Sequence, residues 1–424
     1  MGKGEDTSKK TSTAPVEKID KAEKKQPVVN ELEKKKLAFI TRTIWSLVMI
    51  GSFLVLVLSG HLPLIALVIV FQVLVFKEII ALTSEPARDK NLPYNKSLNW
   101  YFLISTVYFL DGESIFVFLQ DIDMSTPSMM FMYRNHKLIA YTLYLAGFIL
   151  FVYTLKKGFY KFQLAQLCAT HMTLLIVVFQ SHLIIDNIFN GIIWFLLPAA
   201  LVIVNDIFAY LCGITFGRTQ LIAISPKKTV EGFIGAWICT SFAAVLFTYI
   251  LSQSDYLTCP ATQLRTTIYD YPHCEPNPVF IPQLYQLPTN LAEQIGTDVI
   301  IFKPIYFHAI ILATFASLIA PFGGFFASGV KRAFGIKDFG DTIPGHGGIT
   351  DRFDCQFLMG SFSYLYYQTF IAASNITLGK ILQMAVFHLT QDQIVHLTKA
   401  LLKYLGSTGA IEQDKIDKIY DLLN

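Results

Sequence analysis

The sequence predicts an all-α, polytopic integral membrane protein with about nine transmembrane helices. Three observations support this prediction: 53% of the 424 residues are hydrophobic, only 15% are charged, and long apolar segments recur along the chain. A soluble protein of this size could not cover so much apolar side chain with so little charge, whereas a bilayer solvates it. The net charge of +3 gives no reason to expect a nucleic-acid partner.

The apolar segments are long enough to cross hydrocarbon, which takes about 20 helical residues each. They lie near residues 43–60, 62–82, 100–119, 138–155, 164–181, 192–211, 232–251, 305–321 and 357–373. Gly, Pro and Ser interrupt the ends of the last two segments, so their limits are the least well defined.

Lysine and arginine gather in every second connection, and this asymmetry predicts the orientation of the chain. The basic, cytosolic side then holds residues 1–41 and the connections around 88–96, 156–161, 218–228 and 331–352. The opposite connections hold few basic residues. Cys259 and Cys274 lie in the longest of these, at 252–304, where they could pair in an oxidising lumen. Two free thiols are the equally weighted alternative.

Charged residues inside the predicted spans need a reason, because they are costly in hydrocarbon. Asp206 is one, with a functional role or a pairing with a neighbouring Lys or Arg as the alternatives. Asp111 and Glu113 are two others, on either side of Gly112, where a helix break is as good an explanation as function. After the last span, Thr390 and Gln393 predict a capping box that starts an amphipathic helix.

The polar segment 328–354 carries residue types suited to phosphate chemistry beside a membrane. Its cations for phosphate oxygens are Lys331, Arg332, Lys337 and Arg352. Its carboxylates, the ligand type that Mg²⁺ prefers, are Asp338, Asp351 and Asp354. Gly347 and Gly348 follow His346 and let backbone N–H groups approach an anion. A loop of this composition is usually only a solvated face, but such density between membrane spans favours a site.

A second polar stretch follows the sixth span. Ser225 is a good N-cap and Pro226 a good first helical residue, so we expect a helix to begin there. Lys227 and Lys228 would then lie in its first turn, where an anion is already favoured.

The segment from Ser328 to Asp354 resembles the signature of the phosphatidate cytidylyltransferase family, in its eukaryotic branch. The fixed positions of that signature are met by Ser328, Lys331, Arg332, Lys337, Asp338, Gly340, Pro344, His346, Gly347, Gly348, Asp351, Arg352 and Asp354. The stretch from Asn205 to Gly232 is similar to the same family. The resemblance is tight over about residues 200–360 and loose elsewhere, where it rests on the number of spans.

The resemblance implies transfer of the cytidylyl group of CTP to phosphatidic acid, which gives CDP-diacylglycerol and pyrophosphate. The implied catalytic residues are Asp338, Asp351, Asp354, Lys337 and His346, and the three aspartates are the implied Mg²⁺ ligands. The implied substrate-binding residues are Ser328, Lys331, Arg332, Arg352, Gly347, Gly348, Lys227, Lys228 and Asp206. The lipid phosphate is already ionised at neutral pH, so the reaction needs alignment and charge neutralisation rather than a general base.

The resemblance further implies a multi-pass protein of the endoplasmic reticulum membrane whose active site faces the cytosol, alone or as a homodimer. Four regions follow: a disordered Lys-rich cytosolic tail (1–41), N-terminal transmembrane helices (42–190), a catalytic transmembrane region with the lumenal loop 252–304 (191–375), and C-terminal amphipathic helices (376–424). Two alternatives remain at this point. A CTP-dependent polyprenol kinase would need a base to activate a hydroxyl, and a transporter of phosphorylated metabolites should show internal repeats, which we do not find.

Overall fold

The computed structural model describes residues 31–89, 92, 95–120, 127–261, 267–269, 274–286, 298–344, 347–372, 385, 389–409, 415–416 and 418–419. Its long helices are α1 (Glu31–Ser59), α2 (His61–Asp89), α3 (Asn95–Gln120), α4 (Pro127–Tyr153), α5 (Tyr160–Thr173), α6 (Gln180–Asn190), α7 (Ile193–Phe216), α8 (Val230–Leu251), α11 (Ile305–Leu318), α12 (Pro321–Ala333), α13 (Thr350–Phe370) and α15 (Gln391–Ser407). A π-helical segment, Leu174–Phe179, joins α5 to α6, and α9 (Asp255–Thr258) and a 3₁₀ turn (Pro278–Phe280) are short.

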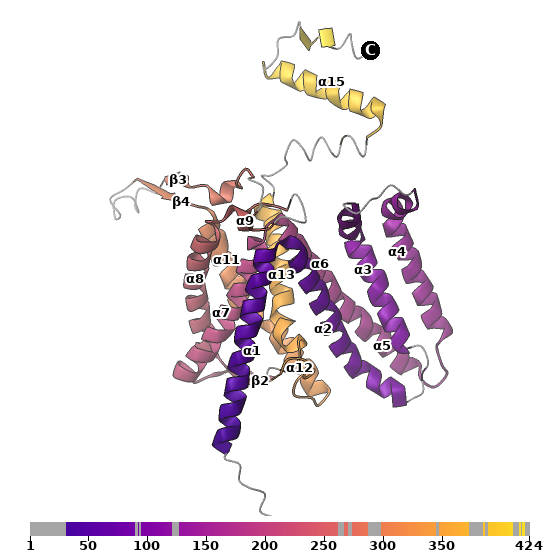
Figure 1. Cartoon of the computed structure of the whole chain (residues 1–424), viewed down its shortest axis with the longest axis vertical. Coiled ribbons are helices and arrows are strands. Elements are labelled where there is room, and N and C mark those ends of the chain that lie inside the picture. The colour runs from indigo at the N-terminus through magenta and orange to yellow at the C-terminus, as the bar shows by residue number, and fades with distance from the viewer. Residues whose placement is uncertain are drawn as a thin grey trace, which may run out of the picture.

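Strands form only two small antiparallel hairpins within the described residues. The first pairs β1 (Gln220–Ile222) with β2 (Ser225–Thr229), and Gln220 faces Thr229. The second pairs β3 (Gln283–Gln286) with β4 (Val299–Phe302). The two hairpins lie at opposite ends of the helices, with β2 and α12 at the lower end in Figure 1 and β3 and β4 at the upper end.

Six helical segments within the described residues are long and apolar enough to cross a membrane. They are His61–Thr83, Arg134–Tyr153, Tyr160–Asn190, Ile193–Phe216, Val230–Leu251 and Ile305–Ala333. Each matches one expected span, so a mostly helical membrane protein is confirmed. The other three expected spans fall on α1, α3 and α13, which are helical but are not among the six. The number nine therefore stays a prediction.

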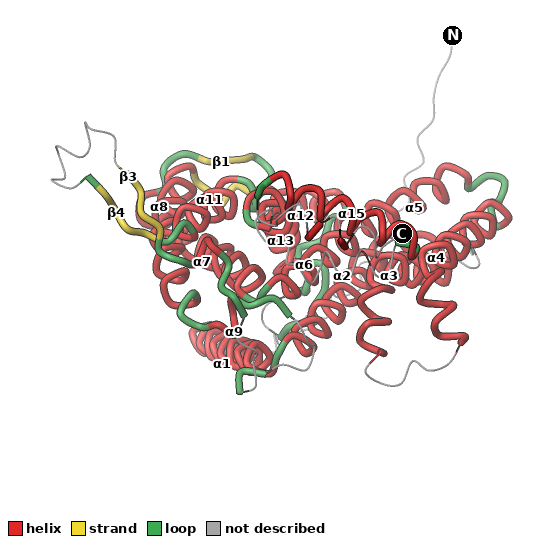
Figure 2. The backbone as a smooth tube through the Cα atoms, turned by 90° about the horizontal axis from the view of Figure 1, so that it is seen from above, coloured by secondary structure: helices red, strands yellow, loops and turns green. Residues whose placement is uncertain are grey.

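The helices form a curved row when seen from above, with α8 and α11 at one end and α3 and α4 at the other (Figure 2). The hydrophobic core is divided along this row. One buried cluster joins α7, α11 and α13, and a second joins α1, α2 and α6 to the first half of α13. A third lies among α2, α3 and the π-helical segment. Because α13 belongs to two of the clusters, it connects the halves of the protein.

Small and polar side chains let α13 approach its neighbours closely. A Cβ added at Gly360 would lie 2.3 Å from Cγ1 of Ile184 on α6, so only glycine fits there. The Asn187 amide donates to the Gly360 carbonyl (2.8 Å), and the Ser363 hydroxyl donates to the Trp194 carbonyl (3.0 Å). Close backbones and interhelical hydrogen bonds are the means by which helices associate in lipid, where burial alone favours no contact.

The structure differs from two interpretations of the local sequence. Residues 31–41, expected to belong to a disordered tail, form the first turns of α1. Their Glu, Lys, Leu and Ala residues are good helix formers and continue directly into an apolar helix. The chain is also not broken at Gly112, because α3 runs through it. Residues 1–30 lie outside the described part of the chain.

Asp111 has a partner that explains a carboxylate inside α3. It is 2% exposed, and its Oδ1 accepts a hydrogen bond of 2.8 Å from Nδ1 of His182 on α6. A Cβ added at Gly112 would lie 3.1 Å from the His136 ring of α4, which explains the glycine by close packing rather than by a break. The side chain of Glu113 lies outside the described residues.

The connection at 252–304 is tied to the helices at its start. Cys259 and Cys274 are joined in a disulfide, which resolves the choice between a bridge and free thiols. The Tyr256 hydroxyl donates to the Val57 carbonyl of α1 (2.6 Å), so the same segment also holds the end of the first helix. Further along the chain, the capping box of Thr390 and Gln393 is confirmed at the start of α15.

The disulfide gives a count that can be measured. We expect a maleimide mass tag to label four thiols in the denatured, unreduced protein, namely Cys168, Cys212, Cys239 and Cys355. Six should be labelled after reduction, because a disulfide does not react with maleimide. Cys168→Ser is the matched control and should lower both counts by one. Six labelled thiols before reduction would contradict the pairing.

Candidate functional site

A largely buried ion pair joins α12 to α13 at the end of the protein that carries β2. Nζ of Lys331 donates to Oδ1 of Asp351 at 2.5 Å, and the two side chains are 17% and 8% exposed. The Phe339 backbone N–H donates to Oδ2 of the same carboxylate (2.9 Å). Asp351 is therefore neutralised and held on both oxygens, and the short α12 is fixed against the start of α13.

A second group of charges surrounds this pair. Asp206 on α7 forms an ion pair of 3.7 Å with Lys228 on β2, and it also lies in the electrostatic field of Arg352. Asp354 lies in the second turn of α13, ahead of the part expected to cross the membrane. Burial raises the pKa of the Asp354 carboxyl to about 6, the charge of Asp206 acts in the same direction, and Lys331 opposes both. The site thus brings carboxylates and cations together from four elements.

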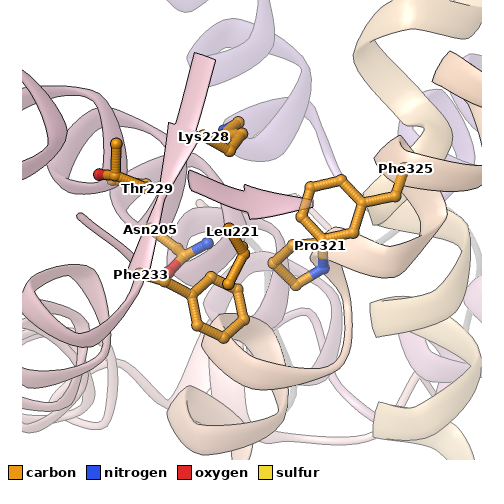
Figure 3. Close-up of a pocket in the computed structure, with 8 residues that line it drawn as sticks. Asn205, Leu221, Lys228, Thr229, Phe233, Pro321 and Phe325 are labelled. Carbon is orange, nitrogen blue, oxygen red and sulfur yellow. The ribbon is translucent and has the colours of Figure 1, made fainter. Parts of the chain in front are cut away.

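A small pocket lies beside Lys228, between α7, the first hairpin, α8 and α12 (Figure 3). Its volume is about 10 Å³, which is room for a single water molecule. Oδ1 of Asn205 is buried in this region with no hydrogen-bond partner among the described residues. Leu221, Phe233, Pro321 and Phe325 supply the apolar walls. The pocket therefore offers one unused acceptor next to a lysine.

The expected helix start at Ser225 is wrong. Ser225 to Thr229 form β2, and α8 begins one residue later with Thr229 as its N-cap, whose hydroxyl oxygen accepts from the Gly232 N–H (3.2 Å). The Glu231 carboxylate accepts from the backbone N–H groups of Arg218 (3.0 Å) and Thr219 (3.2 Å), which folds the preceding chain back as a hairpin.

The strand changes the roles expected for the two lysines. Adjacent residues of a strand point to opposite faces, so Lys227 and Lys228 cannot serve one site in the same way. Lys228 pairs with Asp206, whereas Lys227 is exposed. The hairpin thus aims only Lys228 at the charged cluster, and Lys227 lies on the other face.

The remaining predicted residues are spread more widely. Ser328 is half-buried on α12, while Arg332, Lys337 and Asp338 are exposed. Gly347 has a φ of 85°, which favours glycine, and a Cβ there would lie 3.3 Å from Cγ of Asp338. Gly348 is buried. His346 lies outside the described residues.

The three aspartates predicted to hold a metal do not form a complete metal cage among the described residues. No group of three or more His, Cys, Asp or Glu side chains suited to a metal ion occurs among the described residues. Asp351 uses its two oxygens for Lys331 and the Phe339 N–H. The carboxylates that influence each other electrostatically are Asp206 and Asp354.

One residue of this region was missed. Glu78, on α2, accepts hydrogen bonds from Thr342, Ile349 and Thr350, at the end of the polar segment and the start of α13. The signal was available in the sequence, because Glu78 is an acidic residue inside the apolar segment 62–82. Like Asp206, Glu78 is a carboxylate inside an apolar span, where a charge is costly and needs a reason.

Comparisons with known proteins agree on one family. A model of the cytidylyltransferase family matches residues 40–370. The chain is 53% identical over 410 residues to a phosphatidate cytidylyltransferase of Saccharomyces cerevisiae. The alignment covers 96% of this chain and 90% of that protein. The chain is 45% identical over 381 residues to phosphatidate cytidylyltransferase 1 of Arabidopsis thaliana (88% of this chain, 89% of that protein). It is 44% identical over 372 residues to phosphatidate cytidylyltransferase 1 of Homo sapiens (88% and 80%).

The Lys331–Asp351 pair predicts a clear non-additive effect on stability. Lys331→Met leaves a buried carboxylate without its cation and should lower the free energy of unfolding by about 3 kcal/mol. Asp351→Asn should also destabilise, because its new amide N–H groups face existing donors. The double variant should lose less than the sum of the two, measured by thermal unfolding in detergent. Lys337→Met, at an exposed position, is the control for stability. Additive losses would mean that the pair does not act as a unit.

Proposed function

The chain belongs to the cytidylyltransferase family, and from this membership we propose that it transfers the cytidylyl group of CTP to phosphatidic acid. The products are CDP-diacylglycerol and pyrophosphate, so the protein is a nucleotidyltransferase of phospholipid synthesis. The observation that carries the proposal is the 53% identity to a phosphatidate cytidylyltransferase over 96% of the chain. The charged cluster formed by α7, β2, α12 and the start of α13 supports it, because its residue types suit substrates with several phosphates.

The reaction is a displacement at phosphorus. An oxygen of the lipid phosphate forms a bond to the α-phosphorus of CTP, and the bond from that phosphorus to the bridging oxygen of the β-phosphate breaks. The electron pair leaves with pyrophosphate, and no proton has to move. The protein must therefore align two anions and reduce their repulsion.

Cations of the cluster would perform this task. Lys228 and Arg352 both interact with Asp206, which keeps them at the mouth of the site until phosphate oxygens replace part of that interaction. Arg352 can bind phosphate through two parallel hydrogen bonds. Lys331 is committed to Asp351 and would act mainly through its charge and by fixing α12.

We also propose that Mg²⁺ takes part. The carboxylates of Asp338, Asp351 and Asp354 remain the proposed ligand set, and Asp354 fits best, because its buried carboxyl lies near the charge of Asp206 and would be stabilised by a cation. Mg²⁺ commonly binds one or two carboxylates together with substrate phosphates, so a complete protein cage is not required. When bound, the ion would neutralise phosphate charge and stabilise the leaving pyrophosphate.

The proposed location is the endoplasmic reticulum membrane, with the site on the cytosolic side. The end of the protein that carries β2 and α12 also carries the basic segments 218–228 and 331–352, which the distribution of Lys and Arg favours on the cytosolic side. Both substrates could then reach one site, CTP from water and phosphatidic acid from the adjacent leaflet. The proposal includes a homodimer as one form in which the protein occurs.

The function is tested by substrate choice. Purified protein with labelled CTP, Mg²⁺ and phosphatidic acid should form labelled CDP-lipid and release pyrophosphate, and chelation of the metal should stop both. Diacylglycerol and a polyprenol serve as comparison acceptors. Phosphorylation of either one, with phosphatidic acid inert, would replace the proposal by a lipid kinase.

The hairpin predicts that its two lysines differ. Lys228→Ala should raise the KM for CTP or phosphatidic acid about tenfold, because it removes a cation next to Asp206 and leaves that carboxylate less compensated. Lys227→Ala is the matched control on the opposite face of β2 and should change KM by less than twofold. The two variants are compared in vesicles of constant anionic lipid content. Equal losses that are restored by more anionic lipid would show that both lysines act only by attracting the membrane surface.

A further inference from the structure

The Glu78 carboxylate is enclosed by a distant part of the chain. It is 9% exposed on α2. Its Oε1 accepts from the Thr342 hydroxyl (2.6 Å) and the Ile349 N–H (3.0 Å). Its Oε2 accepts from the N–H (2.9 Å) and the hydroxyl (2.7 Å) of Thr350. Four donors on one carboxylate form a built site for a negative charge, and all four come from one short segment.

Two glycines allow the segment to wrap this closely. A Cβ added at Gly340 would lie 3.0 Å from Oε1 of Glu78, and one at Gly348 would lie 2.9 Å from Oε2. A Cβ at Gly348 would also lie 3.1 Å from Oδ2 of Asp351. A side chain at either position would push the loop away from the carboxylate. The same backbone therefore lies between Glu78 and the ion pair of the site.

Glu78 also completes the start of α13. The first N–H groups of a helix have no acceptor within the helix and are usually satisfied by a nearby Ser, Thr, Asp or Asn. The residue before α13, Ile349, has no side chain that can do this. Glu78 accepts from the N–H groups of both Ile349 and Thr350, and its negative charge lies at the favourable end of the helix dipole.

We propose that Glu78 is a positioning residue for cytidylyl transfer: it sets the direction of the first turn of α13 and the positions of Thr342, Ile349 and Thr350, which bind it. Asp351 follows Thr350 directly and Asp354 lies one turn later, so their directions depend on how α13 begins. This inference rests on the proposed function. Glu78 itself is directed at protein donors and takes no part in the chemistry.

The experiment compares Glu78→Gln with Glu78→Asp and with Lys77→Gln, an exposed neighbour on α2. Glutamine keeps the size of the side chain but turns an N–H group toward donors. We expect kcat to fall about 10- to 100-fold, the range for a small displacement of reacting groups. Aspartate keeps the charge and should recover part of that loss, while Lys77→Gln should stay within twofold of the unsubstituted protein.

Hydrogen exchange separates positioning from general stability. In Glu78→Gln, peptides covering 339–352 should exchange faster, while peptides of α7 should be unchanged. Thr350→Val should lower kcat when it is the only substitution. It should have less effect when combined with Glu78→Gln, because the Glu78 carboxylate that the Thr350 hydroxyl binds is then already lost. Faster exchange throughout the protein, with activity lost in proportion to folded protein, would overturn the inference. So would a kcat within twofold of the unsubstituted protein.

The two proposals fail in different ways. If the unsubstituted protein makes no CDP-lipid, the proposed function fails, and the exchange of 339–352 still decides whether Glu78 holds this segment. If the unsubstituted protein is active and the Glu78 variants are equally active, the proposed function stands and the positioning role is wrong.

Discussion

The ion pair between Lys331 and Asp351 is the constraint on which the candidate site depends. It places α12, a short amphipathic helix, against the start of α13 and neutralises a carboxylate that is 8% exposed. The Phe339 N–H donates to the second oxygen of that carboxylate, so the chain between α12 and α13 is held at the same point. The more exposed charges of the cluster, Asp206, Lys228 and Arg352, interact with one another, and under the proposed function they would be the groups that meet the substrates.

Helix α13 shows why the protein combines catalysis with a membrane-embedded core. It needs polar side chains at its start for the site and along its length for contacts with α6 and α7, such as Gln356 to the Ala199 carbonyl (3.2 Å). These side chains lower its hydropathy, although two of the three buried clusters include it. A central helix can be polar because its neighbours, rather than lipid, surround it.

The helical membrane fold and the family could be predicted from the sequence, because apolar length and the family signature are local properties. The hairpin of β1 and β2 could not be predicted in this way. It is held by Glu231, which lies after β2 and accepts hydrogen bonds from the backbone N–H groups of Arg218 and Thr219, before β1. The Cys259–Cys274 bond was one of two open alternatives, since pairing depends on how the loop folds. The donors on Asp351 were equally hidden, because the spacing of residues along a chain does not show that Lys331 and the Phe339 N–H already bind both of its oxygens.

The separation between Glu78 and its donors has a consequence for biosynthesis. Ile349 is 271 residues away along the chain. At translation rates of about 5–20 residues per second, Glu78 enters the membrane roughly 15 to 50 seconds before its partners exist. During that interval the nascent chain carries an uncompensated acidic group at membrane depth, which is costly. A chain that ends before Thr342 would therefore leave the Glu78 carboxylate without the four donors that stabilise its charge.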